Sequence, residues 1–201
     1  MAIVNIFPTP IYHTQLEHIH INHTNYKFYD CGNGHISYAT NILHDFPQLQ
    51  QEIQSHLDSY TTQLGYTTQT TITTSWFNLH KHHGYCQLHN HSNSIISGVV
   101  FITIPIDSGK FLFKRNNSSN DKLFTMQVEM DTTEQSTQYT GMEYIIDPTP
   151  NTLLLFPSSL SHMVTPNNSI EERLTLAFNV IPCGIIGNNQ QNFIEFRNST
   201  P

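Results

Sequence analysis

The sequence predicts a mainly β protein with the jelly-roll fold (the double-stranded β-helix), supported from outside by one or two α-helices from its N-terminal third. From residue 67 onward, short runs of β-branched and aromatic residues alternate with turns rich in Gly, Asn, Ser and Pro. No helical pattern lies between these runs, which favours a sandwich or barrel over a parallel α/β fold. We expect residues 1–201 to form a single domain, because this length is ordinary for one β-rich unit.

Within this domain, we expect residues 1–66 to supply an N-terminal arm and helices, and residues 67–201 to form the β-helix core. The arm begins with an apolar segment, 3–12, that carries two prolines. Proline cannot donate to a β-ladder, so this segment fits an edge strand or an extended arm better than a central strand.

A helical period covers residues 37–64, where apolar side chains recur every three or four residues: Ile42, Leu43, Phe46, Leu49, Ile53, Leu57, Tyr60 and Leu64. Pro47 suits the first position of a second helix in this region. We expect Asp45 to cap that helix and Gly65 to end it in a left-handed turn. The apolar stripe predicts that these helices pack on the outside of a sheet.

The strands of the core are predicted from period-two alternation and from turn residues at their ends. They are expected at residues 67–79, 95–105, 110–114, 122–130, 142–146, 152–156 and 172–181. Two polar stretches, 116–121 and 131–140, are expected to be loops. The second is long enough to cover a site.

Charge and hydropathy exclude several classes of partner. The net charge is −7, with only 8 Lys plus Arg and no basic run, so no duplex nucleic acid partner is expected, although a single extruded base remains open. No segment approaches the roughly 18 apolar residues of a membrane span, so we expect no membrane partner and a cytoplasmic protein. The three cysteines are scattered and are expected to be reduced thiols.

Three histidines form the most informative chemical pattern in the chain. His89 and His91 are two residues apart, and on a β-strand such side chains share one face. The apolar run that begins at Phe156 continues through a turn to His162, which can bring a third imidazole back to the first two. Imidazole binds Fe(II), Co, Ni, Cu and Zn, so the pattern predicts a metal site without selecting the metal.

A polar face on the last core strand suggests a binding site for an anion. Leu174, Leu176 and Phe178 point to one side of this strand, so Arg173 and Thr175 must point to the other. A guanidinium and a hydroxyl at this spacing suit a carboxylate. Asn78 follows Trp76 at the same spacing and is a candidate for cosubstrate or substrate contact, with a sheet-lining amide as the alternative.

A second histidine-rich run, His80 to His83, precedes Gly84. We expect it to be a solvated turn and not a second metal site. Gln87 and Ser97 flank the histidine pair and are weaker candidates for orienting ligands.

Several of these segments, in order and spacing, resemble the 2-oxoglutarate/Fe(II) oxygenases found in phages and marine bacteria. The segments are Phe7–Tyr12, Trp76–Asn78, His89–Phe101, Phe156–Pro157, His162 and Arg173, and together they span most of the chain. The resemblance implies the jelly-roll fold, Fe(II) as the metal and 2-oxoglutarate as cosubstrate. It also implies that Arg173 and Thr175 bind the distal carboxylate of 2-oxoglutarate. His91 stands where the wider superfamily has an aspartate.

Two other functions fit part of the pattern. A cupin-type three-histidine metalloenzyme would use the same ligands without 2-oxoglutarate, but Ile95 and Ile96 replace the glutamate expected after the histidine pair. A non-catalytic jelly-roll, such as a virion or sugar-binding protein, would carry the histidines incidentally. The pair of Arg173 and Thr175 argues against the first alternative, and bound metal would exclude the second. The sequence leaves open whether the substrate is a small molecule or a protein, and whether the chain is a homodimer.

Overall fold

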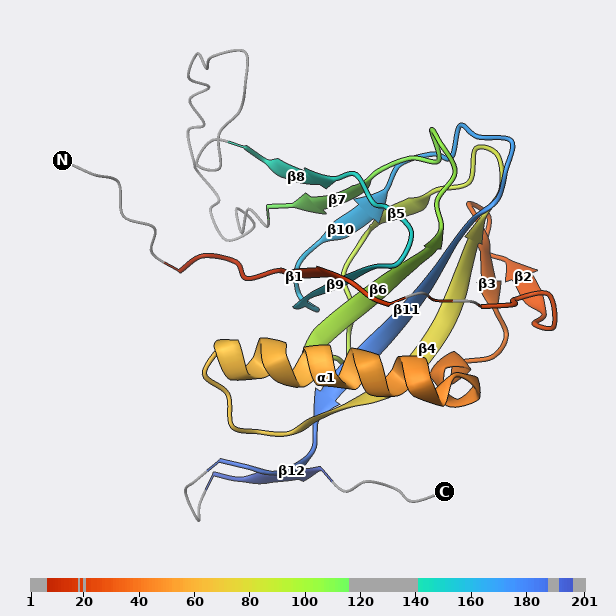
Figure 1. The fold of residues 1–201 in the computed structure, drawn as a ribbon. Coiled ribbons are helices and arrows are strands. Elements are labelled where there is room, and N and C mark those ends of the chain that lie inside the picture. Colours follow the sequence, from red (N-terminus) through yellow and green to blue (C-terminus); the bar gives the residue numbers. More distant parts are fainter. Residues whose placement is uncertain (1–6, 18, 20, 116–140, 188–191, 197–201) are drawn as a thin grey trace.

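Two antiparallel sheets make up most of the protein (Figure 1). The computed structural model describes residues 7–17, 19, 21–115, 141–187 and 192–196. The larger sheet has the order β1 (Tyr12–Gln15), β9 (Thr152–Pro157), β6 (Ile96–Thr103), β11 (Arg173–Pro182), β4 (Thr70–His80), β3 (His35–Ser37) and β2 (Phe28–Asp30). The smaller sheet has the order β5 (Cys86–His89), β10 (His162–Val164), β7 (Phe111–Lys114) and β8 (Glu143–Ile146).

The path of the chain between these sheets confirms the jelly-roll. From β4 to β11, the chain crosses repeatedly between the larger and the smaller sheet, and hydrogen-bonded neighbours within each sheet run antiparallel. Alternate residues of the central strands therefore point either into the space between the sheets or to the outside. The inward face is where a site can form.

A helix covers the outer face of the larger sheet. The α-helix α1 (Pro47–Gln63) follows the 3₁₀ turn η1 (Ile42–Asp45) and lies across the sheet in Figure 1. The core beneath it joins apolar residues of the helix to the outward side chains of the sheet: Leu49, Ile53, Leu57, Tyr60, Phe77, Leu174, Leu176 and Phe178. The predicted helix period and its outside position are thus confirmed.

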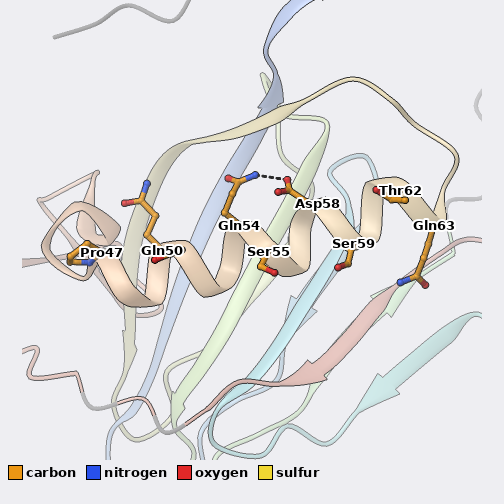
Figure 2. A pocket seen from close by; sticks show the side chains of 9 residues that line it. Pro47, Gln50, Gln54, Ser55, Asp58, Ser59, Thr62 and Gln63 are labelled. Carbon is orange, nitrogen blue, oxygen red and sulfur yellow. Dashed lines mark hydrogen bonds between the residues drawn. The ribbon is translucent and has the colours of Figure 1, made fainter.

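The opposite face of α1 is polar. Gln50, Gln54, Asp58 and Thr62 line a shallow groove there, and Figure 2 shows the hydrogen bond from Gln54 Nε2 to Asp58 Oδ1, at 2.8 Å. Glutamine, serine and threonine side chains on an exposed helix face need no further partner than water. This groove lies on the outside of the domain and not between the sheets.

The start of α1 differs from the prediction, whereas its end agrees. Phe46, not Asp45, occupies the N-cap position, and no side chain caps the helix. The Asp45 carboxylate instead accepts a hydrogen bond from the Tyr26 hydroxyl at 2.7 Å, so it is not available as a cap. Gly65 has φ +81°, as the predicted left-handed turn requires.

Most predicted strands are present, and the N-terminal segment contributes to the sheet. β1 (Tyr12–Gln15) is an edge strand, but it begins only at the last residue of the proline-containing segment; residues 7–11, with both prolines, lie in no strand and agree with an extended arm. The predicted strand 122–130 and the predicted loops 116–121 and 131–140 lie outside the described residues. The predicted ranges do not include the short strands β2, β3, β10, β12 (Gly184–Ile186) and β13 (Ile194–Phe196), of which the last two form a separate hairpin. Within the described ranges, no helix has the length and apolar character to cross a membrane.

Candidate metal and cosubstrate site

Three histidines converge between the two sheets. His89 ends β5, His162 begins β10, and the two residues are directly paired across the smaller sheet. His91 follows two residues after His89, and one nitrogen of each of the three imidazoles lies within 4.8 Å of the others. The structure therefore brings together the three residues that the sequence predicted as metal ligands.

His91 reaches this cluster in a way that strand geometry alone did not predict. β5 ends at His89, so His91 lies beyond the strand and not on its face. The His91 backbone N–H donates to the carbonyl of Ser158, at 3.0 Å, which fixes the chain after it leaves the smaller sheet. The two rings of the pair are nearly parallel, with an interplanar angle of 21°.

The hydrogen bonds of the three rings select which nitrogen faces the centre. His89 Nδ1 lies 2.8 Å from the Gln87 carbonyl, and His162 Nδ1 lies 2.9 Å from the Leu160 carbonyl. His91 Nδ1 lies 2.6 Å from the side-chain oxygen of Asn179. Each of these oxygens accepts, so each Nδ1 carries the proton and donates it. All three Nε2 lone pairs are left free to bind a metal.

The spacing of these lone pairs fits a shared ion. Nε2 of His89 and Nε2 of His91 are 3.2 Å apart. Two imidazole nitrogens, each about 2.1 Å from one ion and at about a right angle, would be separated by about 3 Å. Two unprotonated nitrogens at this distance repel each other through their lone pairs unless a cation lies between them. The donor set suits Fe(II) among the first-row metals that imidazole binds.

Burial favours the neutral, metal-binding form of two of these rings. Burial lowers the pKa of His162 to about 3, and the neighbouring His89 and His91 act in the same direction against the Leu160 hydrogen bond. Burial also lowers the pKa of His91. Protons therefore compete weakly with a cation at these positions.

Aromatic side chains enclose one side of the cluster. Phe111 stacks on the His162 ring at a centroid distance of 5.5 Å and an interplanar angle of 17°. Phe156 meets the same ring edge-on at 4.8 Å. Trp76 lies 5.8 Å from the His91 ring on another side. These rings restrict the imidazoles and reduce the access of water.

Asn179 connects His91 to a hydroxyl network on the larger sheet. Its Oδ1 accepts the His91 proton and lies 3.4 Å from the Ser97 hydroxyl. Ser97 in turn bonds to Ser158 at 2.8 Å, and Ser158 donates to Ser94 at the same distance. The sequence suggested Ser97 as a residue that orients a ligand, and Ser97 does support His91 through Asn179. Gln87 contributes through its backbone carbonyl, while its side chain is exposed.

Arg173 is buried at the start of β11, on the inward face that also carries Asn179. Only 1% of its surface is exposed. One terminal nitrogen donates to the Ser108 carbonyl at 2.6 Å, and the other lies 3.1 Å from His80 Nδ1. Its Nε is buried and has no hydrogen-bond partner among the described residues. Burial lowers the pKa of Arg173 to about 10, so the guanidinium remains charged at neutral pH.

A buried charged group with an unpaired donor costs folding free energy unless a ligand or a water molecule accepts a hydrogen bond from that donor. Thr175 is the next inward residue of β11 and is also buried. It pairs in register with Asn78 of β4, which places both side chains on the face that carries Arg173. The Asn78 amide oxygen accepts a hydrogen bond from the Trp76 indole at 3.2 Å. This face therefore presents a cation, a hydroxyl and an amide to the space between the sheets.

His80 is the principal site residue that sequence reasoning missed. The expected turn begins only after it: His82 and His83 are exposed, whereas His80 is the last residue of β4 and is 5% exposed. It lies directly opposite Arg173 in the strand register. The period of two from Trp76 through Asn78 to His80 was the signal that could have found it.

The jelly-roll fold, the converging imidazoles and the buried arginine together define a non-haem metal oxygenase architecture. A family model described as "Putative 2OG-Fe(II) oxygenase" matches residues 74–179. The chain belongs to this family and is a 2-oxoglutarate- and Fe(II)-dependent oxygenase, with Fe(II) as its metal and 2-oxoglutarate as its cosubstrate. No protein with a curated description matches the sequence.

Solved structures share the fold at low sequence identity. An oxidoreductase of the 2OG-Fe(II) oxygenase family from Burkholderia pseudomallei is 11% identical, with a TM-score of 0.56 over 78% of this chain and 72% of that one. The α-ketoglutarate-dependent epimerase SnoN from nogalamycin biosynthesis is also 11% identical, with a TM-score of 0.55 over 81% and 69%. A prolyl-4-hydroxylase from Pseudomonas putida is 15% identical, with a TM-score of 0.50 over 76% of each chain.

Proposed function

We propose that this oxygenase hydroxylates its substrate at a site in which His89, His91 and His162 hold Fe(II). The overall reaction converts a C–H bond of the substrate, 2-oxoglutarate and O₂ into the alcohol, succinate and CO₂. The observation that carries the ligand assignment is the set of three Nδ1–H donors, each directed to a protein oxygen. This pattern leaves Nε2 of each ring as the free ligand atom, and one nitrogen of each ring lies within 4.8 Å of the others.

Bound Fe(II) and 2-oxoglutarate supply the oxidising chemistry, and the residues of the chain supply position and environment. Asn179 holds His91 in the required tautomer. Phe111 and Phe156 fix the His162 ring and keep its surroundings apolar. A preorganised set of ligands in a dry cavity is the usual contribution of a protein to metal-ion catalysis.

Arg173 and Thr175 are proposed to bind the distal carboxylate of 2-oxoglutarate, with Asn78 beside them. Support comes from the buried guanidinium, whose Nε has no partner within the described part of the chain. A carboxylate would satisfy this donor and neutralise the buried charge through charge-assisted hydrogen bonds. Thr175 is adjacent on the same strand face and can add a hydroxyl donor.

Three neutral imidazoles distinguish this site from one with two imidazoles and a carboxylate. The ligand set here leaves the metal one positive charge higher, because His91 replaces an anion. This favours the binding of the anionic cosubstrate. It also gives the site a feature shared with three-histidine cupin enzymes, so a cupin-type reaction without 2-oxoglutarate is the competing function.

An anaerobic titration separates the two functions. Fe(II) is added to the metal-free protein, followed by 2-oxoglutarate, and visible absorption is recorded for the charge-transfer band of the chelate. The oxygenase function predicts a saturable band with one 2-oxoglutarate per iron, and succinate after O₂ is admitted. Tight iron binding with no band and no succinate would favour the cupin-type function instead. An absence of metal binding would favour a non-catalytic jelly-roll.

We also propose a cytoplasmic protein from a phage or a marine bacterium, acting in the host cytoplasm in the phage case. The resemblance of the motifs supports the origin. The three cysteines, Cys31, Cys86 and Cys183, are all free thiols, which fits a reducing compartment. The net charge of −7 supports a small-molecule or protein substrate over duplex nucleic acid. A homodimer remains a hypothesis that sedimentation would test.

A further inference from the structure

Arg173 is held by two protein acceptors before any ligand binds. The guanidinium has five N–H donors. One points to the Ser108 carbonyl and a second to His80 Nδ1. The Nε donor has no partner among the described residues. The two existing contacts therefore fix the plane of the guanidinium, while Nε and the other terminal hydrogens remain for a ligand.

His80 is itself fixed on several sides. Its ring is 5% exposed, and its backbone carbonyl accepts a hydrogen bond from the buried Asn167 amide at 2.9 Å. The Tyr85 backbone near the ring acts to raise the pKa of His80, against the larger effect of burial. Gly34 packs directly against it: a Cβ at this position would lie 2.9 Å from His80 Cδ2 and 3.1 Å from Nε2. The absence of a side chain at residue 34 is what makes room for the ring.

His80 can accept from Arg173 only as a neutral imidazole with its proton on Nε2. Because Nδ1 faces the Arg173 donor, Nε2 is the nitrogen left to carry the proton. Burial, followed by the charge of Arg173, lowers the pKa of His80 to about 3. The ring therefore remains neutral over the pH range in which enzymes of this kind are assayed.

We propose that His80 is a positioning residue, which fixes the Arg173 guanidinium in the orientation that binds the distal carboxylate of the cosubstrate. This inference rests on the proposed role of Arg173. The long arginine side chain carries substantial rotamer entropy, and an acceptor that holds it in place before binding lowers the cost of binding. His80 touches neither the metal ligands nor the reacting atoms in this scheme. Its effect should be confined to the far end of the cosubstrate.

Two cosubstrates test this confinement: 2-oxoglutarate, and 2-oxopentanoate, which has the same carbon chain but lacks the distal carboxylate. Dissociation constants are measured anaerobically with Fe(II) from the charge-transfer band. His80→Phe keeps an aromatic ring but removes the acceptor. It should weaken 2-oxoglutarate binding by roughly ten-fold, about the loss of one hydrogen bond to a charged group, and leave 2-oxopentanoate binding unchanged.

His80→Leu provides a second variant without an acceptor, and His80→Gln restores one through its side-chain oxygen. We expect His80→Leu to behave like His80→Phe, and His80→Gln to recover most of the preference for 2-oxoglutarate. His82→Leu is the matched control, because His82 is exposed two residues later. It should bind both acids as the wild type does. Thermal unfolding of each variant reports whether the fold is intact.

The outcomes separate this inference from the function on which it rests. One outcome is that Arg173→Lys loses the preference for 2-oxoglutarate while His80→Phe and His80→Leu both retain it. In that case the positioning role of His80 is wrong, and Arg173 still binds the distal carboxylate. If the His80 variants weaken the two acids equally, His80 has only a structural role and the inference is again wrong. If the wild-type protein shows no preference between the acids, both proposals are overturned.

Discussion

The Oδ1 atom of Asn179 on the larger sheet lies 2.6 Å from Nδ1 of His91, which follows a strand of the smaller sheet. This hydrogen bond spans the space between the sheets. It fixes the tautomer of a proposed metal ligand, so Asn179 should influence metal affinity without touching the metal.

Asn179→Leu should therefore reduce metal affinity by about 10- to 100-fold, the usual cost of removing a group that orients a ligand. Asn179→Asp keeps an acceptor and should stay close to the wild type. Competition with a chelator, using Co(II) as a redox-stable probe, measures the affinity. Equal Co(II) affinity in Asn179→Leu and the wild type would show that the hydrogen bond does not orient His91.

Replacing His89, His91 or His162 with alanine should each remove a ligand and lower metal affinity by more than about 100-fold, beyond the cost of losing a mere orienting group. His82→Ala is the control, because this exposed side chain contacts the Ser169 carbonyl, at 3.0 Å, and the neighbouring His83 ring, and neither belongs to the proposed site. Metal content of the purified variants is measured by atomic spectroscopy. Loss of metal in His82→Ala but not in His162→Ala would refute the ligand assignment.

His91→Asp tests whether imidazole is required at this position. The carboxylate restores an anionic ligand, and the Asn179 amide can rotate so that its nitrogen donates to it. We expect Fe(II) binding to persist and 2-oxoglutarate binding to weaken, because the site is one charge less positive. Succinate formation is measured alongside. Complete loss of metal would mean that the pocket is shaped around imidazole and cannot accept the shorter ligand.

Arg173→Lys should weaken 2-oxoglutarate binding by about 1.5–3 kcal/mol, because lysine cannot reproduce the planar arrangement of the guanidinium donors. Thr175→Val should cost less, on the order of 1 kcal/mol for one neutral hydrogen bond. Metal content should survive both changes, since neither residue contacts the three histidines. The carboxylate site would have to lie elsewhere if Arg173→Lys bound 2-oxoglutarate like the wild type.

Gly98→Ala should destabilise the fold. Gly98 of β6 pairs with Phe178 of β11, and a Cβ on Gly98 would lie 2.0 Å from the Phe178 ring. Phe178 is fully buried under the helix, so overpacking here should cost about 1–3 kcal/mol of unfolding free energy. Urea denaturation measures it. The double variant with Phe178→Leu should recover part of the loss, and its failure to do so would place the strain elsewhere.

The sequence was sufficient to predict most of the long strands of the core and the residues of the histidine cluster, because both depend on local period and on spacing. His91 nevertheless lies beyond the end of β5. The prediction that His89 and His91 share one face of a strand therefore named the correct residue but assumed the wrong local structure. The partner of His91, Asn179, is 88 residues away. No local pattern identifies which of several inward polar residues accepts a given proton.

Two errors of the sequence-based prediction, at Asp45 and at His80, have the same physical origin. Asp45 has the chemistry of a helix cap, but the Tyr26 hydroxyl binds its carboxylate instead. His80 stands in a histidine-rich run typical of a solvated turn, but its place opposite Arg173 buries it. In each case a partner distant in sequence outweighs the local preference. The three-residue strands β2 and β3 were missed because so few residues carry no detectable period.

The division of the site between two sheets has a consequence for the lifetime of the protein. His89 and His162 belong to the smaller sheet, whereas His91 is fastened through Asn179 to the larger one. An ion bound by all three histidines would act as a cross-link that holds the two sheets together at one end. On the proposed ligand assignment, a metal at 100 times its dissociation constant would add about 2.7 kcal/mol to the stability of the folded state. In a cell short of iron, the metal-free enzyme would then be inactive and would also unfold and be degraded more readily.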